Sequence, residues 1–493
     1  MVNKFDSRNM SMALDKYELT MANAYFRDGR LDERVVFDVF YRKNPDGGGF
    51  SILAGVLPAI DFIDNFGFND DDIAYLKSQK CFDDNFLDYI KDNKFDIKVT
   101  GLYEGTIVYP NTPLMTIEAP IIFAQMLETY ILTLINHGCL IATKANRFVR
   151  AANGRPIADF GARRAHGGDA AVYGARSASI GGVAATATVM SGEIWPDIPI
   201  TGTMAHSWVQ SYSSELEAFK KFADYEPNNC VLLIDTIDTL KSGVINAIKT
   251  FDYLKEKNNG AIPGNYGIRI DSGDLAYLSK EVRKKLNDAG YKDAKIVVSN
   301  SLTEQIIRSL LDEQNAPIDS FGVGENLITA KSDAVFGAVY KLVGVIDSEG
   351  NVIPKIKISN NVEKITNPGR KNLFRIYGPD NYAIGDVITD QYNVDENTVC
   401  ILPEKHWIHQ TFKGLNIEKL TKVIYERKNG KKIHDVRGIL DLKQIRRFVK
   451  NQIDNFVYPE VLRFENPYSY PVYMEDSYYN MKMDLLKSSM GVK

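Results

Sequence analysis

A single histidine follows a short apolar run in the segment Ile198-Pro-Ile-Thr-Gly-Thr-Met-Ala-His-Ser-Trp208. The run has the length of a buried strand, and the glycine and hydroxyl residues after it supply donors where a ligand could lie close. In such a place His206 could act as a general base or as a nucleophile that accepts a phosphoryl group. The alternative is a structural histidine that is held by hydrogen bonds at a strand end, and the segment alone does not decide between these roles.

Four aspartates also follow apolar runs. They form two spaced pairs, Asp235 with Asp238 and Asp271 with Asp274. Such pairs are suited to holding ribose hydroxyls, or a Mg²⁺ ion that itself carries phosphates. Capping of the following helix is the alternative, above all for Asp274, which directly precedes a helical pattern.

Two adjacent arginines, Arg163 and Arg164, follow another predicted strand. Two guanidinium groups suit bidentate binding of a carboxylate or a phosphate, although one of them could be an ion-pair partner. Glycine-flanked segments in the later strands offer backbone N–H and hydroxyl donors, as phosphate sites do. These segments are Ser272-Gly273, Ser299-Asn300-Ser301 and Gly322-Val-Gly324.

Short apolar strands alternate with helix-length segments between Pro156 and Ala330. This alternation predicts βα units and a parallel sheet, and about six units suggest a barrel. The polar residues described above stand at the carboxyl ends of the strands, which converge on one rim in such a barrel. We therefore expect one active site. Ordinary solvated loops, the alternative, would not repeat Asp, Arg and His beside glycine.

The flanking parts of the chain have a different pattern, in which helices mix with strands and turns. We expect three regions: a discontinuous α+β sandwich domain over 1–150 and 335–427, an irregular α/β barrel that carries the active-site rim over 151–334, and a C-terminal extension over 428–493.

The composition excludes several classes of protein. With 59 basic and 63 acidic residues the formal net charge is −4, which gives no global reason to bind nucleic acid or an anionic membrane. The four cysteines are widely scattered, so neither a zinc site nor a disulfide framework is indicated. The N-terminus lacks the apolar core of a signal peptide, and polar residues interrupt the most apolar stretch, 121–141. A cytoplasmic protein is expected.

Several of these segments jointly resemble the nicotinate phosphoribosyltransferase family, whose members make nicotinate mononucleotide with the help of ATP. They are Asp159-Phe-Gly-Ala-Arg-Arg-Ala-His166, Gly202-Thr-Met-Ala-His-Ser207, Arg269-Ile-Asp-Ser-Gly-Asp-Leu275, Phe321-Gly-Val-Gly-Glu-Asn-Leu-Ile-Thr329 and Lys355-Ile-Lys-Ile-Ser359 with Lys364-Ile-Thr-Asn-Pro-Gly369. The resemblance implies an irregular TIM-like barrel joined to an open-faced sandwich. It also implies nicotinate, phosphoribosyl pyrophosphate and ATP as substrates, Mg²⁺ as cofactor and a homodimer that shares its active sites.

The resemblance assigns roles to individual residues. His206 would be the histidine that ATP phosphorylates, and Asp235 and Asp271 would be the catalytic and Mg²⁺-binding carboxylates. Thr203 would line the nicotinate pocket.

Two aromatic residues would enclose the pyridine ring. Tyr17 would reach in from the partner subunit, and Phe160 would face it, because an offset aromatic sandwich suits a flat ring.

The anionic groups of the substrates would be bound by a further set of residues. Arg163, Arg164 and Arg269 would share the nicotinate carboxylate and the pyrophosphate. The ribose phosphate would lie near Ser299, Asn300, Ser301, Gly322, Gly324 and Glu325. Glu325 stands where some relatives have threonine.

Three alternatives differ in activity. The nicotinamide-using relatives place an acidic residue in the segment that corresponds to 181–192, whereas this chain has none there, which favours nicotinate. Quinolinate phosphoribosyltransferase needs a more basic site for two carboxylates and no ATP. A barrel without catalytic activity, which serves as a scaffold, is the third alternative.

Overall fold

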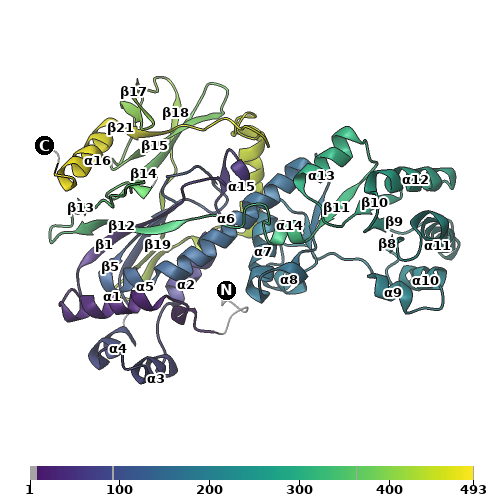
Figure 1. The fold of residues 1–493 in the computed structure, drawn as a ribbon, viewed down its shortest axis with the longest axis horizontal. Coiled ribbons are helices and arrows are strands. Elements are labelled where there is room, and N and C mark those ends of the chain that lie inside the picture. Colours follow the sequence, from purple (N-terminus) through teal and green to yellow (C-terminus); the bar gives the residue numbers. More distant parts are fainter. Residues whose placement is uncertain (1–7, 92–93, 362–363, 492–493) are drawn as a thin grey trace. The chain divides into compact units, whose positions relative to one another are not determined.

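The computed structural model describes residues 8–91, 94–361 and 364–491. The chain forms two compact units (Figure 1): unit 1 contains Met1–Leu140 and Val335–Lys493, and unit 2 contains Ile141–Ala334. The residues expected to form a C-terminal extension, 428–493, therefore belong to unit 1. A long helix, α6 (Glu128–Ala151), crosses the boundary between the units.

Unit 1 contains a seven-stranded antiparallel sheet. Its strands, in spatial order, are β13 (Val352–Pro354), β12 (Val339–Ile346), β1 (Arg34–Phe40), β5 (Met115–Pro120), β3 (Ile97–Gly101), β19 (Lys422–Lys428) and β20 (Lys431–Asp435). The three central strands come from the N-terminal part of the chain, and the later part adds two strands on each side. Unit 1 is therefore one body, although two distant stretches of sequence build it.

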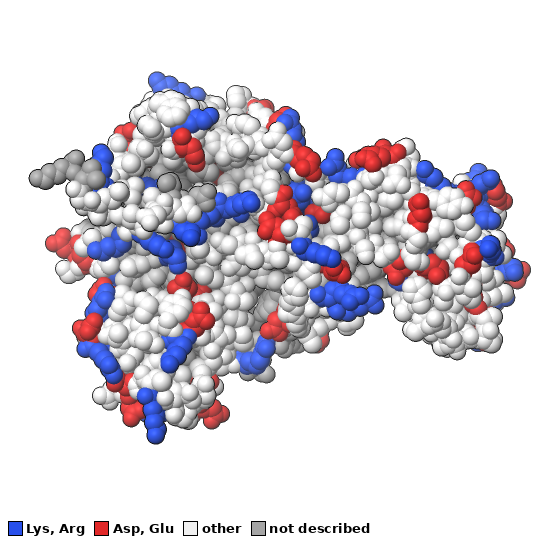
Figure 2. Space-filling view, viewed as in Figure 1, with Lys and Arg blue, Asp and Glu red and all other residues white. Residues whose placement is uncertain are grey.

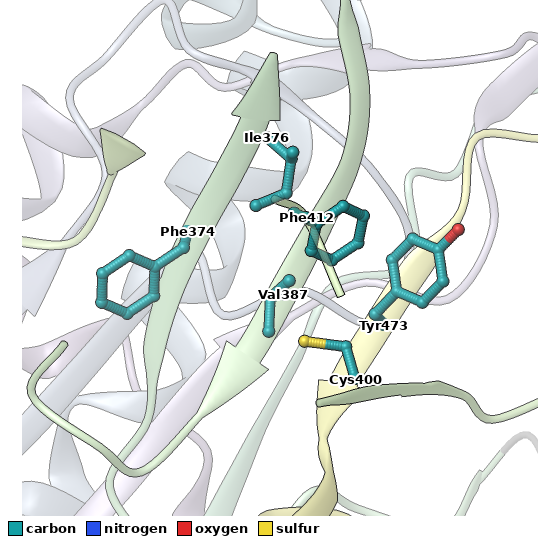
Figure 3. Packing of buried hydrophobic residues seen from close by; sticks show 6 residues of the cluster. All are labelled: Phe374, Ile376, Val387, Cys400, Phe412 and Tyr473. Atoms are coloured by element: carbon teal, nitrogen blue, oxygen red, sulfur yellow. The ribbon is translucent and has the colours of Figure 1, made fainter. Parts of the chain in front are cut away.

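A second sheet of unit 1 comes entirely from the later part of the chain. Its order is β17 (Lys405–Gln410), β16 (Cys400–Leu402), β21 (Val472–Glu475), β15 (Ala383–Thr389), β14 (Asn372–Tyr377) and β18 (Asn416–Lys419). Figure 3 shows the buried side chains that pack on it, namely Phe374, Ile376, Val387, Cys400, Phe412 and Tyr473. Burial of each Val, Ile or Phe side chain among them contributes about 1.5–3 kcal/mol to folding. A two-stranded ribbon joins β2 (Ser51–Ile52) to β4 (Ile107–Val108).

The helices of unit 1 carry clear sequence signals at their ends. Asn69 and Asp441 form capping boxes at the starts of α3 (Asp70–Ser78) and α15 (Leu442–Asn455). The apolar stretch from 121 onward forms two helices, α5 (Ile121–Met126) and α6, with Leu127 between them. The other helices are α1 (Lys16–Arg27), α2 (Val56–Asn65), α4 (Asp84–Lys91) and α16 (Asp476–Ser489).

Unit 2 contains a six-stranded parallel sheet. Its order is β7 (Ala185–Thr186), β6 (Ile157–Asp159), β11 (Ser320–Val323), β10 (Lys295–Val298), β9 (Asn265–Ile270) and β8 (Asn229–Leu233). The first strand in sequence, β6, thus pairs with the last, β11. Among the described residues no ladder joins β7 to β8, so the sheet is open between them.

Helices alternate with these strands, as the sequence predicts, and the mixed α/β class is confirmed. They are α7 (Gly168–Ile180), α8 (Val189–Ile194), α9 (His206–Gln210), α10 (Glu215–Tyr225), α11 (Val244–Lys257), α12 (Leu275–Asp288), α13 (Glu304–Arg308) and α14 (Glu325–Ile328). In Figure 1, α12 runs beside β9 and β10, with which it is in contact.

The prediction of a buried strand at residues 198–200 is wrong. Only a single bridge forms there, between Ile200 and Thr186, and Ile200 is 57% exposed. The physical reason is Pro199, which has no N–H to give to a ladder.

The surface and the thiols agree with the composition. Figure 2 shows acidic and basic side chains interspersed over the visible face. The cysteines are all free thiols, and only Cys81 is exposed. No helix in the described part of the chain is long and apolar enough to cross a membrane.

Candidate active site

The first residue of α9, His206, is paired with a carboxylate at the end of a strand. Its Nε2 atom lies 3.1 Å from Oδ1 of Asp235, which follows β8. The carboxylate is buried, with 2% of the side chain exposed, whereas 41% of the imidazole is exposed. A buried charge therefore orients a ring that remains open to a reactant.

The other oxygen of Asp235 is held from the neighbouring strand. It accepts hydrogen bonds from the Asp271 N–H at 3.0 Å and from the Ser272 hydroxyl at 2.6 Å, both just after β9. The Asp271 carboxylate in turn accepts the hydroxyl of Ser299, which follows β10. Contacts therefore run from His206 across the ends of three adjacent strands, because parallel strands bring their carboxyl ends to one edge.

A second group of contacts surrounds Arg269 near the end of β9. Its Nη1 donates to the hydroxyl of Thr203, and its guanidinium carbon lies 6.0 Å from the centre of the Phe160 ring. Burial lowers the pKa of Arg269, while the carboxylates of Asp271 and Asp235 oppose that shift. Its Nε is buried without a hydrogen-bond acceptor among the described residues, so this cation has a donor left for an anion beside a flat ring.

The turn after β6 fixes the backbone of Phe160. The Phe160 N–H donates to the Val323 carbonyl at 2.8 Å. The buried Asp159 carboxylate accepts the Gly161 N–H and the Thr186 hydroxyl, each at 2.8 Å, and burial raises the pKa of Asp159. Asp159 was not among the predicted site residues. Its position two residues before a glycine at a strand end is the signal that could have found it.

Arg163 and Arg164 lie exposed on the short 3-10 helix Ala162–Arg164. Within the described residues neither guanidinium group makes a hydrogen bond or an ion pair, so both are available to an anion. Glu325, at the start of α14, bonds to Lys331 at 2.7 Å. That hydrogen bond lowers the pKa of Glu325, and the charge of Arg164 adds to the effect. Its carboxylate is thus already paired with a cation of the same loop.

The loop after β10 has an unusual backbone. Asn300 and Ser301 have φ values of 96° and 48°, in the region that favours glycine. The side-chain amide of Asn326 donates to the carbonyls of Ser301 and Leu302, at 3.2 and 2.9 Å. Asn326 therefore holds this loop in place. It was not predicted, because nothing in the local pattern marks a contact that only the tertiary structure creates.

The glycines of the rim differ in environment. Gly273 is exposed with a φ of 80°, which explains glycine at this turn. Gly322 is buried within β11, and Gly324 follows the strand.

Two of the four aspartates are helix caps. Asp238 accepts the N–H groups of Leu240 and Lys241, at 3.1 and 2.9 Å. Asp274 accepts the Tyr277 N–H at 3.0 Å, at the start of α12. For these two residues the capping alternative holds, and only Asp235 and Asp271 belong to the contacts that reach His206.

Tyr17 belongs to unit 1, on α1, and is 45% exposed. Burial of its hydroxyl and the nearby Glu128 carboxylate raise the pKa of Tyr17. It is not among the residues that unit 2 brings together, and its contact with a ligand in a partner subunit stays a prediction.

A cavity of about 340 Å³ lies where the sheet of unit 2 is open. Ala187 and Thr203 line it, and the hydroxyl of Thr203 accepts the hydrogen bond from Arg269. The remaining lining residues are Val189, Ile200, Thr201, Gly202, Phe222, Glu226 and Asn229. The segment 181–192 therefore contributes an alanine and a valine to this cavity and no carboxylate.

The carboxylates of the site differ in their fitness for Mg²⁺. Both oxygens of Asp235 already face hydrogen-bonding groups, so it is less open to a metal ion than Asp271. Asp271 has one oxygen with no hydrogen-bond donor among the described residues. No cluster of three or more metal-ligating side chains occurs in residues 8–91, 94–361 and 364–491. A protein that offers one carboxylate fits Mg²⁺ when substrate phosphates supply the other ligands.

A parallel sheet that presents a paired histidine and open arginine donors along one edge defines an α/β enzyme for anionic substrates. Three family models match the chain: the nicotinate phosphoribosyltransferase N-terminal domain over residues 12–136, the family model over 156–375 and the C-terminal domain over 370–482. The chain belongs to the nicotinate phosphoribosyltransferase family.

Individual relatives cover nearly the whole chain. The nicotinate phosphoribosyltransferase of Bacillus subtilis is 38% identical, over 97% of this chain and 96% of its own length. That of Caenorhabditis elegans is 32% identical, over 97% and 93%.

Two crystal structures share the fold. Human nicotinic acid phosphoribosyltransferase matches with a TM-score of 0.82 at 24% identity, over 96% of this chain and 99% of that one. The nicotinate-nucleotide pyrophosphorylase of Pyrococcus furiosus matches with a TM-score of 0.67 at 22% identity, over 92% and 99%.

Proposed function

We propose that this chain is a nicotinate phosphoribosyltransferase, which makes nicotinate mononucleotide and pyrophosphate from nicotinate and phosphoribosyl pyrophosphate in NAD salvage. The similarity to the Bacillus subtilis enzyme over almost the full length supports this proposal. The observation that carries it is the pairing of Arg269 with Phe160 at 6.0 Å, because nicotinate is a flat ring that bears one carboxylate. In the same proposal, unit 2 is an irregular barrel that is open between β7 and β8, and unit 1 is the sandwich.

In the transfer step, the pyridine nitrogen gives its lone pair to C1 of the phosphoribosyl donor. The bond from C1 to the pyrophosphate oxygen breaks, and its electron pair leaves with pyrophosphate through an oxocarbenium-like state. Arg163 and Arg164 are suited to bind the leaving pyrophosphate because they are exposed and unpaired within the described residues. Arg269 would hold the nicotinate carboxylate.

Mg²⁺ would be held by the open oxygen of Asp271, together with pyrophosphate oxygens, and would supply charge neutralisation to the leaving group. Asp235, whose oxygens are already engaged, acts on His206 instead. This assignment changes one of the two predicted metal ligands into a positioning residue.

The pairing of His206 with Asp235 supports the proposal that ATP phosphorylates His206. The carboxylate accepts the proton on Nε2 and so leaves the lone pair on Nδ1. That lone pair forms a bond to the γ-phosphorus of ATP, the bond to the bridging oxygen breaks, and ADP leaves. Attack by water on the phosphohistidine later regenerates the imidazole and releases phosphate, which couples ATP hydrolysis to synthesis as an ATP-dependent ligase requires.

The remaining elements of the proposal concern the substrate and the assembly. The preference for nicotinate over nicotinamide is supported by the segment 181–192, which contributes Ala187 and Val189, and no carboxylate, to the cavity beside Thr203. We also propose a cytoplasmic homodimer in which Tyr17 stacks on nicotinate in the partner subunit, opposite Phe160.

The test compares the full chain with a His206→Ala variant. With nicotinate and phosphoribosyl pyrophosphate, the wild type should form nicotinate mononucleotide faster when ATP is present. The variant should lose ATP stimulation while retaining slow, ATP-independent transfer. His409→Ala, at an exposed histidine of β17 in unit 1, is the matched control and should behave as wild type.

Other outcomes would contradict the proposal in distinct ways. Equal turnover of nicotinamide would contradict the substrate assignment, and transfer to quinolinate without ATP would indicate the alternative phosphoribosyltransferase. A correctly folded protein without any transfer activity and without acid-labile, base-stable phosphate after incubation with ATP would indicate a scaffold.

A further inference from the structure

Gly322 of β11 packs directly against the ring of Phe160. A Cβ atom at this position would lie 2.4 Å from Cε2 and 2.5 Å from Cδ2 of that ring, whereas ordinary contact begins at 3.4 Å. The φ angle of Gly322 lies outside the left-handed region, so its backbone conformation is open to other residues. The ring, and not the backbone, is what requires glycine here.

The backbone of Phe160 cannot move away to make room. Its N–H is bonded to the Val323 carbonyl, and the next N–H, that of Gly161, is bonded to the buried Asp159. Gly161 is itself confined, because a Cβ there would lie 2.6 Å from Cβ of Ile328. A methyl group at position 322 therefore has to displace the Phe160 ring, by about 1 Å.

The position of this ring matters because of its partner across the site. The guanidinium carbon of Arg269 lies 6.0 Å from the ring centre. An aromatic carboxylate that binds this cation places its own ring within stacking range of Phe160, since ring centres in such pairs lie about 4.5–7 Å apart. A shift of about 1 Å in one aromatic wall changes this fit, and misplacement on that scale can cost about 10²-fold.

We propose that Gly322 is a positioning residue for nicotinate: by having no side chain, it seats the Phe160 ring at the distance from Arg269 that the pyridine carboxylate needs. This inference rests on the proposed function. It differs from the role that the glycine-rich segment suggests, which is close approach of the backbone to the ribose phosphate. The two roles predict effects on different substrates.

The first experiment is steady-state kinetics of Gly322→Ala in the full chain. We expect KM for nicotinate to rise about 10- to 100-fold, while KM for phosphoribosyl pyrophosphate stays within about two-fold of wild type. Gly168→Ala is the matched control, because a Cβ at Gly168, at the start of α7, meets open space. A rise in KM for phosphoribosyl pyrophosphate with an unchanged KM for nicotinate would overturn the proposal.

The second experiment repeats the substitution in a Phe160→Ala background. Alanine lacks both Cδ2 and Cε2, the two atoms that a Cβ at position 322 would meet, so Gly322→Ala should now change KM for nicotinate by less than about two-fold. An equal penalty in both backgrounds contradicts the proposal. If the single variant does not fold, normal folding of the double variant supports the steric explanation, and failure of both contradicts it. A wild-type chain that forms no nicotinate mononucleotide would contradict the proposed function, whereas an active wild type with an unaffected Gly322→Ala variant would contradict this inference alone.

Discussion

Replacement of Asp235 by asparagine should slow the phosphorylation of His206. The two oxygens of Asp235 face different partners: one meets His206 Nε2, and the other accepts two donors, the Asp271 N–H and the Ser272 hydroxyl. The two donors select the amide oxygen for their side, so the amide NH₂ turns toward His206. The imidazole must then accept at Nε2 and carry its proton on Nδ1, where the reacting lone pair was.

The size of the effect follows from what is lost. A hydrogen bond to a charged group contributes about 1.5–3 kcal/mol, which corresponds to about 10- to 150-fold in rate. Because the carboxylate is buried but 41% of the imidazole is exposed, solvent screening moves the expected effect toward the lower end of this range. The assay is rapid-quench measurement of acid-labile, base-stable phosphate on the protein from labelled ATP, with phosphorus NMR to identify the modified nitrogen as Nδ1.

Asp238→Asn is the matched control. Asp238 lies in the same loop but caps backbone N–H groups, a role that asparagine performs equally well, so its phosphorylation rate should equal that of wild type. Phosphorylation of Asp235→Asn within two-fold of the wild-type rate would refute the proposed orientation of the imidazole. Phosphate found on Nε2 of the wild-type histidine would refute it as well.

Three further predictions concern other parts of the chain. Asn326→Ala should raise KM for phosphoribosyl pyrophosphate several-fold more than KM for nicotinate, because it releases the loop at Asn300; equal changes in both would count against this role. Burial raises the pKa of Glu18 from 4.5 to about 7, so the folded state binds its proton more tightly and the free energy of unfolding should fall as pH rises across that range. Thermal unfolding should therefore show that Glu18→Gln is more stable than wild type at pH 8 but not at pH 4.5. The same stability difference between variant and wild type at both pH values would contradict the raised pKa of Glu18. In the native protein one thiol, Cys81, should react rapidly with a thiol reagent, because burial raises the pKa of each of the other three cysteines to about 12; a mass shift on any of those three at the same rate would refute this.

The sequence predicted the site residues well where a local pattern places several strand ends at the same edge of a sheet. Apolar strands that alternate with helices imply a parallel sheet, and a parallel sheet brings residues such as Asp235, Asp271 and Ser299 to one side whatever their separation in sequence. The histidine could be singled out from the small residues around it. Its partner could not, because 29 residues separate His206 from Asp235 and the pairing depends on tertiary packing.

Other features were beyond the reach of local patterns. The aspartates of each pair look alike in sequence, and only the direction of their side chains separates the caps Asp238 and Asp274 from the residues that reach His206. The run near Ile200 is as apolar as a buried strand, but it forms a single bridge to Thr186 in place of a ladder. Hydrophobic patterning does not register the N–H that Pro199 lacks.

The seven-stranded sheet of unit 1 makes the order of synthesis important for folding in the cell. The central strands β1, β5 and β3 are complete by Pro120, whereas the first strand that borders them, β12, begins at Val339, roughly 220 residues later. At synthesis rates of about 5–20 residues per second, both outer edges of this trio stay unpaired for about 10–40 s. Exposed edges are templates for pairing with other chains. Unit 2, whose residues are contiguous, is synthesised during this interval, and a chaperone that covers the edges of the N-terminal trio would prevent their pairing with other chains.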